Sequence, residues 1–94
     1  MTAGSLPLPG RVALVTGGSK GLGKAMARAY AEQGADVVIS SRHEGELKAA
    51  LEEILAGTGR RGAYVVADMT DRSAADRLGK AALEKMGRVD ILVN

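Results

Sequence analysis

The chain has 94 residues, of which 46% are hydrophobic and 26% charged, and its formal net charge is +2. This globular composition excludes disordered and collagen-like chains, and no apolar run approaches the ~20 residues that span a bilayer. The small positive charge and the 2% aromatic content argue against nucleic-acid binding, and the absence of cysteine excludes disulfides and thiolate metal sites. We therefore expect one small domain of a soluble, cytoplasmic protein that binds no nucleic acid, membrane or metal ion.

Residues 1–10 are expected to form an N-terminal arm that leads into the first strand. Pro7 and Pro9 disfavour a helix, and little in this segment can be buried. The segment also lacks the basic start and the long apolar core of a signal peptide. The domain itself is therefore predicted to span residues 11–94.

Four short apolar runs alternate with three segments of helical period. The runs predict strands at 11–16, 36–41, 63–68 and 89–94, and their continuity is typical of parallel strands that are covered on both faces. The apolar stripes predict three helices, which end near Gly34, near Gly57 or Gly59, and at Gly87. The stripe residues are Leu22, Ala25, Met26, Ala29 and Tyr30; Leu47, Leu51, Ile54 and Leu55; and Ala75, Leu78, Ala82, Leu83 and Met86.

Two residues, one before the third helical segment and one inside it, bear on how that helix begins and how stable it is. Asp71 precedes the segment and is the candidate N-cap. Gly79 lies inside the segment, where glycine costs about 1 kcal/mol relative to alanine. The helix is therefore expected to form in spite of Gly79, through its apolar stripe.

The alternation predicts an α/β fold of the Rossmann type, in the order β-α-β-α-β-α-β. Parallel strands with right-handed crossovers give a doubly wound sheet of strand order 3-2-1-4, with two helices on one face and the third on the other. The fourth strand then lies at an open edge, although it is rich in Ile, Leu and Val. We expect the chain to be the N-terminal part of a longer protein, and a small independent module is the alternative.

The segment 16–23 (TGGSKGLG) joins the first strand to the first helix. Glycines allow backbone angles that other residues avoid and let a phosphate approach the main chain. The following helix offers free N–H groups and the positive end of its dipole to that anion. A glycine-rich turn without a ligand is the alternative, but a glycine loop between strand and helix is the context that phosphate binding requires. The residues predicted to hold a pyrophosphate are Gly17, Ser19, Gly21, Leu22 and Gly23.

This loop fits two general nucleotide-binding strings imperfectly. The dinucleotide string GxGxxG places Met26 at its third glycine. The mononucleotide string GxxxxGK[ST] fits Gly18, Gly23 and Lys24, but Ala25 replaces the hydroxyl residue that would hold magnesium. Asp68 could imitate a magnesium-binding aspartate, and a P-loop-like NTPase therefore stays an alternative.

Thr16 and Gly17, together with Gly21 and Gly23, form the string TGxxxGxG, which resembles the short-chain dehydrogenase/reductase family. Asp68 and the run 90–94 (DILVN) resemble the same family, and the resemblance covers residues 10 to 94. It implies a cofactor-binding half of an oxidoreductase that transfers hydride between a nicotinamide cofactor and a small carbonyl or alcohol substrate. The family normally continues from the position of Asn94 into a second Asn, Ala and Gly, which this sequence does not contain.

The end of the second predicted strand distinguishes NAD from NADP. NAD enzymes place a carboxylate there, whereas this chain has Ser41 followed by Arg42. Serine can donate to a 2′-phosphate, and the planar guanidinium suits phosphate oxygens. The resemblance adds Lys20, at a position where a basic residue marks NADP-preferring members. We predict NADP(H), held at its 2′-phosphate by Lys20, Ser41 and Arg42, and solvated surface cations are the alternative.

The resemblance also assigns three contacts on the adenosine side. It implies that the Asp68 carboxylate contacts the adenine amino group and that the Met69 backbone contacts the edge of the ring. It also implies that Asn94 borders the ribose. A helix-capping role is the alternative for Asp68, and fraying of the chain end is the alternative for Asn94.

Catalysis in this family uses a tyrosine, a lysine four residues later and an upstream serine. Tyr30 is followed four residues on by Gly34, and Tyr64 by Asp68, so neither fits. Both tyrosines are predicted to be core residues, and the chain is expected to carry no catalytic residue. The substrate, and the contacts of a homo-oligomeric parent, would belong to the later half of such a protein.

Overall fold

The computed structural model describes residues 9–93, so most of the predicted arm and the predicted site residue Asn94 lie outside the described residues. The elements are β1 (Val12–Thr16), α1 (Gly21–Glu32), β2 (Asp36–Ser41), α2 (Glu44–Leu55), β3 (Gly62–Val66), α3 (Ala74–Met86) and β4 (Ile91–Val93). Their order confirms the predicted alternation of strands and helices. The bounds of three strands differ by one or two residues from those predicted, and Asp68 therefore lies two residues beyond β3.

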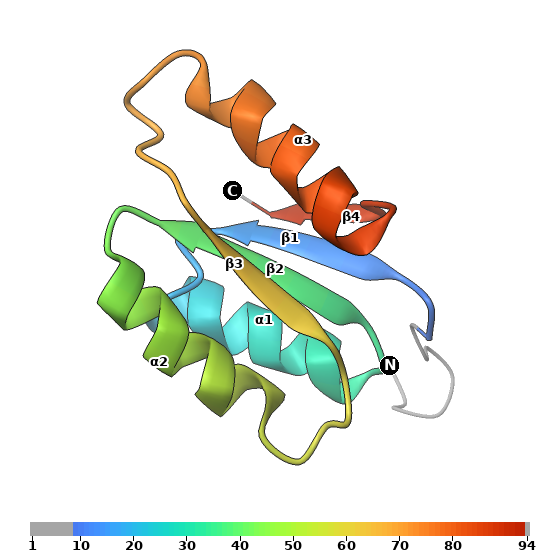
Figure 1. Cartoon of the computed structure of the whole chain (residues 1–94). Helices are drawn as coiled ribbons and strands as arrows, with labels where there is room; N and C mark the ends of the chain where they lie inside the picture. Colours follow the sequence, from blue (N-terminus) through green and yellow to red (C-terminus); the bar gives the residue numbers. More distant parts are fainter. Residues whose placement is uncertain (1–8, 94) are drawn as a thin grey trace.

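The four strands form one parallel sheet in the order β3-β2-β1-β4, which confirms the predicted topology. Helices α1 and α2 cover one face and α3 covers the other (Figure 1). This arrangement follows from right-handed crossovers, because the chain winds from β1 towards β3 and then returns to the far side of β1. The carboxyl ends of all the strands consequently meet at one edge, where the three loops that precede the helices also lie.

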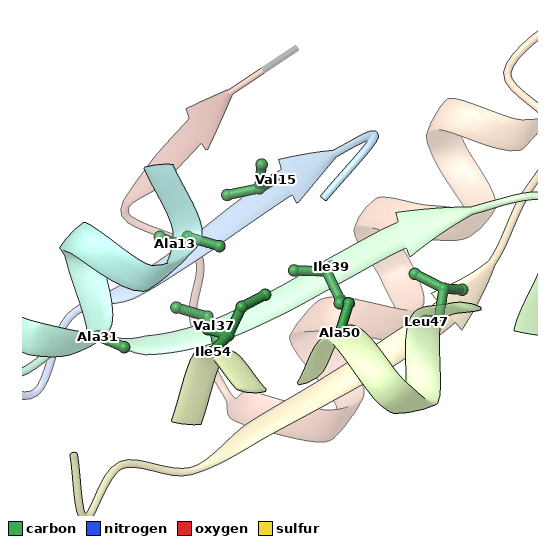
Figure 2. Packing of buried hydrophobic residues seen from close by; sticks show 9 residues of the cluster. Ala13, Val15, Ala31, Val37, Ile39, Leu47, Ala50 and Ile54 are labelled. Atoms are coloured by element: carbon green, nitrogen blue, oxygen red, sulfur yellow. The ribbon is translucent and has the colours of Figure 1, made fainter. Parts of the chain in front are cut away.

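Side chains of the central strand β2 alternate between two core layers. Val37 and Ile39 pack on the face of α1 and α2, against residues such as Leu47 and Ile54 (Figure 2). Val38 packs on the opposite face, in a smaller cluster that contains Leu78 of α3. The smaller cluster reflects the single helix on that face.

The predicted stripe of α1 is partly wrong. Leu22 is 77% exposed, and Ala25 and Ala29 are exposed as well, whereas Ala27 and Ala31 are fully buried. The face of α1 that meets the core therefore carries alanines, whose small side chains allow the helix backbone to approach the sheet. The predicted stripe included the exposed Ala25 and Ala29 and omitted the buried Ala27 and Ala31, so the predicted face is rotated away from this contact.

The stripe of α2 is confirmed, and that of α3 is confirmed in part. Leu78 and Ala82 of α3 are buried, but Ala75 and Leu83 are exposed. They lie beside an apolar groove of about 440 Å³, whose lining also includes Leu14, Leu78, Gly79, Val89 and Leu92. Among the described helices only α3 lies on this face of the sheet, so the flank of α3 above β4 has no covering partner there (Figure 1).

The prediction of an open edge at the fourth strand is confirmed. Among the described strands β4 pairs only with β1, and Leu92 at its centre is 60% exposed. An edge strand with an exposed apolar side chain resembles one that a further element would cover. Separately, no helix within residues 9–93 has the length and hydrophobicity needed to cross a membrane.

The start of α3 corrects the assignment of Asp71 as its N-cap. Ser73 occupies the N-cap position, and its side chain makes no capping hydrogen bond. Asp71 Oδ1 instead accepts the backbone N–H and the hydroxyl of Ser73, both at 2.9 Å. The carboxylate lies two residues too early to cap the helix, so it stabilises the preceding turn. The predicted end at Gly87 is confirmed, with a left-handed φ of 82°.

Candidate functional site

The glycine loop between β1 and α1 folds back over the carboxyl end of β2. Gly17 and Gly21 have φ angles of 69° and 55°, which side chains would strain. The backbone N–H groups of Gly17 and Gly18 both donate to the carbonyl oxygen of Ser40, at 2.8 and 3.3 Å. These bonds fix the predicted phosphate loop beside the end of β2.

Two other glycines of the loop are required by space rather than by angle. A Cβ at position 18 would lie 2.6 Å from Cγ2 of the buried Ile39, and a Cβ at position 23 would meet the carbonyl oxygen of Gly17. Gly18 was not assigned a role from the sequence, and its role is close packing of the loop on the core. Gly23 lets the first turn of α1 rest against the loop backbone.

The start of α1 carries no acidic residue of its own. The N-cap residue, Lys20, is extended and forms no side-chain cap, and the first turn contains no acidic residue. The first helical hydrogen bond from this end runs from the Lys24 N–H to the Lys20 carbonyl at 3.2 Å. The N–H groups of Gly21, Leu22 and Gly23 precede it, and such groups together with the helix dipole bind anions.

A hollow of about 380 Å³ lies at the carboxyl ends of β1, β2 and β3. Of the predicted site residues, it brings together Gly17, Ser41, Arg42, Asp68 and Met69, and its other lining residues are Ser40, Ala67 and Thr70. The predicted residues Ser19, Lys20, Gly21, Leu22 and Gly23 do not line this hollow. They lie in the loop and the first turn of α1, which adjoin it through Gly17.

Asp68 and Arg42 give the hollow an acceptor and a donor. Asp68 Oδ1 accepts the hydroxyl of Thr70 at 2.7 Å and its backbone N–H at 3.0 Å. These hydrogen bonds, and next the positive charge of Arg42, hold the pKa of Asp68 below its ordinary value, so the carboxylate stays ionised at neutral pH. Arg42 is exposed and has no ion-pair partner among the described residues.

Lys20, unlike Arg42, has an ion-pair partner. Its Nζ lies 3.0 Å from Glu46 Oε1 on α2, and its side chain is 72% exposed. Part of its charge is therefore balanced by a neighbouring carboxylate before any ligand is bound. Of the two predicted cations, Arg42 is the better placed to recognise a phosphate group.

Lys24, the lysine of the mononucleotide-type string, is directed elsewhere. Its ammonium group forms an ion pair with Glu53 of α2, and both residues line a separate hollow with Arg28. A phosphate-binding lysine would have to leave this pair and cross to the other side of the loop. The arrangement disfavours the NTPase alternative.

Three residues were missed from the sequence, two of them at the hollow and the third in the separate hollow beside α1. Thr70 anchors Asp68 as described, and Ser40 lines the hollow with a fully buried side chain. Arg28 of α1 donates through Nη1 to the carbonyl oxygens of Glu53, Ile54 and Ala56, at 3.2, 3.0 and 2.6 Å. The position of Ser40 at a strand end was a usable signal, whereas nothing in the sequence placed Arg28 beside the end of α2.

The two tyrosines contact the core, as predicted. Tyr30 and Tyr64 are partly buried and pack against the cluster between the sheet and α1 and α2. The Tyr64 hydroxyl donates to Glu44 at 3.4 Å. Within residues 9–93 no group of three or more potential metal ligands is present.

Comparison with known proteins gives the family to which this geometry corresponds. The family model described as short chain dehydrogenase matches residues 11–94. An uncharacterized oxidoreductase of Mycobacterium tuberculosis is 45% identical over 87 residues, which are 93% of this chain and 33% of that protein.

Two solved structures with bound coenzyme are also similar. L-Sorbose reductase of Gluconobacter frateurii, complexed with NADPH and L-sorbose, is 31% identical, with a TM-score of 0.88 over 95% of this chain and 34% of its own. The RhlG/NADP complex of Pseudomonas aeruginosa is 37% identical, with a TM-score of 0.85 over the same shares of each chain. The chain thus spans about a third of the length of the relatives that it matches.

Proposed function

Since this chain belongs to the short-chain dehydrogenase/reductase family, we propose that it is the NADP(H)-binding part of an oxidoreductase. The chain spans about a third of its relatives, so hydride transfer to a carbonyl or from an alcohol is proposed for a polypeptide of their length. The proposal adds NADP(H), rather than NAD(H), as the coenzyme of this particular chain.

The observation that carries this choice is the pair Ser41 and Arg42 at the carboxyl end of β2. A carboxylate at this place would repel a 2′-phosphate, whereas β2 ends in Ser41 and is followed by Arg42, which has no ion-pair partner within residues 9–93. Ser41 Oγ accepts the backbone N–H of His43 at 3.2 Å, which leaves its own hydrogen available for donation. A neutral donor beside a planar cation suits a phosphate dianion.

The remaining residues fit the other parts of a dinucleotide. The pyrophosphate would lie against the N–H groups at the start of α1, where the loop backbone carries no side chain at Gly17, Gly21 and Gly23. The ionised Asp68 can accept from the adenine amino group. When bound, the nicotinamide ring supplies the hydride donor or acceptor. No tyrosine of this chain is followed four residues later by lysine, so the proton transfer is assigned to residues outside it.

Calorimetric titration with NADPH, NADH and Mg·ATP tests the proposal. It is made on the 94-residue chain and on a chimaera in which the remaining two thirds of the Mycobacterium tuberculosis relative follow Asn94. We expect NADPH to bind at least about tenfold more tightly than NADH, because one charge-assisted hydrogen bond gives about that preference. Equal affinities would contradict the choice of NADP(H), and magnesium-dependent binding of ATP would favour the NTPase alternative.

A further inference from the structure

Ser40 contains the single buried side-chain polar atom without a hydrogen-bond partner among the described residues. The atom is its hydroxyl oxygen Oγ, and the residue is 0% exposed. Its backbone carbonyl, by contrast, accepts two N–H groups of the glycine loop. Buried hydroxyls are usually paired, because burial without a partner costs free energy. The unpaired hydroxyl at this place therefore calls for a partner from outside the chain.

The alternation along β2 places Ser40 on the α3 side of the sheet. Val37 and Ile39 face α1 and α2, whereas Val38 faces α3, so Ser40 shares the side of Val38 and Ser41 takes the other. Ser40 nevertheless lines the hollow, together with Asp68, Met69 and Thr70 from the segment after β3. The two adjacent serines thus border the same hollow, with their side chains on opposite faces of the sheet.

Two neighbouring hydroxyl groups, one in the same hollow and one on the adjacent strand, already donate to partners within the chain. The Thr70 hydroxyl donates to Asp68, and the hydroxyl of Thr16, which is paired with Ser40 in the sheet register, donates to the Val93 carbonyl at 3.2 Å. Neither hydroxyl forms a hydrogen bond with Ser40 Oγ. The free hydrogen of Ser40 and the ionised, acceptor-only carboxylate of Asp68 form a donor and an acceptor that line one hollow.

We propose that Ser40 is a base-recognition residue, whose hydroxyl donates to N7 of adenine while Asp68 accepts from the neighbouring exocyclic amino group. Adenine presents this acceptor and this donor side by side, whereas guanine presents two acceptors, one of which would face the carboxylate. The pair thus selects adenine over guanine. The inference rests on the proposed dinucleotide-binding function and deepens it, since Ser40 acts on the base and Ser41 with Arg42 on the 2′-phosphate.

The test compares Ser40→Ala with Ser41→Ala, on both the 94-residue chain and the chimaera. Dissociation constants are measured for NADPH, NADH and the guanine analogue of NADPH, and urea unfolding is measured without ligand. Ser40→Ala should weaken NADPH and NADH by the same factor, about two- to tenfold for one hydrogen bond, and should narrow the preference over the guanine analogue. Ser41→Ala should weaken NADPH selectively.

Stability without ligand provides a second measurement, in which Ser40→Ala should cause no loss although it weakens binding. Removing an unpaired buried hydroxyl should leave the urea midpoint of Ser40→Ala unchanged or higher. A lower midpoint with unchanged affinities would show a structural serine and overturn the inference, as would unchanged affinities in a folded variant. Should Ser40→Ala fail to fold, Ser40→Cys, which has a similar shape and a weaker donor, carries the same comparison. If neither the unaltered 94-residue chain nor the unaltered chimaera binds NADPH or NADH, the proposed function is wrong, and the inference that rests on it is wrong as well.

Discussion

Gly23 in the first turn of α1 lies directly against the carbonyl oxygen of Gly17, with no space for a side chain between the two backbones. The contact sets the distance between the start of the helix and the loop that follows β1. Since the N–H groups proposed to bind pyrophosphate belong to this turn, the same contact fixes their position. The packing of one glycine against another thus positions the proposed anion-binding backbone.

Replacing Gly23 with alanine should therefore destabilise the chain. The added methyl group meets a backbone atom that cannot turn away, and overpacking of this kind costs about 1–3 kcal/mol. Urea unfolding of Gly23→Ala measures the loss, and nucleotide affinity should fall as well. Gly79→Ala in α3 is the matched control, because nothing lies within 4 Å of the added Cβ. It should stabilise the chain by about 1 kcal/mol, and losses of similar size in both variants would contradict this account.

Arg42→Ala should reduce affinity for NADPH while affinity for NADH barely changes. The lost charge-assisted hydrogen bond to the 2′-phosphate corresponds to about a ten- to hundredfold change in the dissociation constant. Calorimetric titration with both coenzymes measures the difference. Arg60→Ala, an exposed arginine that does not line the hollow, should change neither affinity. Equal losses for both coenzymes in Arg42→Ala would refute the assignment.

Arg28→Ala should lower the free energy of unfolding by about 1–3 kcal/mol, since one guanidinium serves three carbonyl groups at the end of α2. Urea unfolding provides the measurement. Lys24→Ala, on the same helix, removes only an ion pair with Glu53 at the surface, and its cost should stay below about 1 kcal/mol. If the two variants had the same free energy of unfolding, the contacts of Arg28 with the three carbonyl groups would not stabilise the chain more than the surface ion pair of Lys24.

Asp71 should titrate at an unusually low pH. Hydrogen bonds from the Ser73 N–H, from Arg77 and from the Ser73 hydroxyl lower its pKa to about 2. Because the folded pKa is depressed, this stabilisation is complete above the ordinary value of 3.8 and is lost as pH falls towards 2. Carboxyl-carbon NMR measures the pKa, which should rise towards 3.8 in Arg77→Ala. Ordinary titration of Asp71 in the unaltered chain would disprove the turn described before α3.

The order and the pairing of the strands could be predicted from the sequence. Buried parallel strands need apolar residues on both faces, so runs such as 36–41 stand out from the helical period around them. Right-handed crossovers and the usual winding of the Rossmann type then give the strand order 3-2-1-4. The face of α1 was predicted only in part, because Tyr30 packs against the core as expected, whereas the buried Ala27 and Ala31 were not in the predicted stripe.

The candidate site was predictable as a set of chain positions, and only in part as a set of contacts. The loop 16–23 and the serine–arginine pair at the end of the second strand could be identified because each lies where a strand ends. The partners of Lys20 and Lys24 are carboxylates of α2, and Thr70 binds Asp68 across a turn. Those contacts depend on the packing of helices and on the path of loops, which local patterns do not specify.

The sequence by itself determined which main-chain segments carry the proposed phosphate contacts, because backbone N–H groups need only glycines and a helix start at the right spacing. Tertiary structure decided which side chains serve the same hollow. Ser40 and Asp68 lie 28 positions apart in the sequence, and they line one hollow because β2 and β3 are parallel neighbours whose carboxyl ends coincide. The burial that leaves the Ser40 hydroxyl without a partner exists only when the sheet, the glycine loop and the segment after β3 are assembled around it.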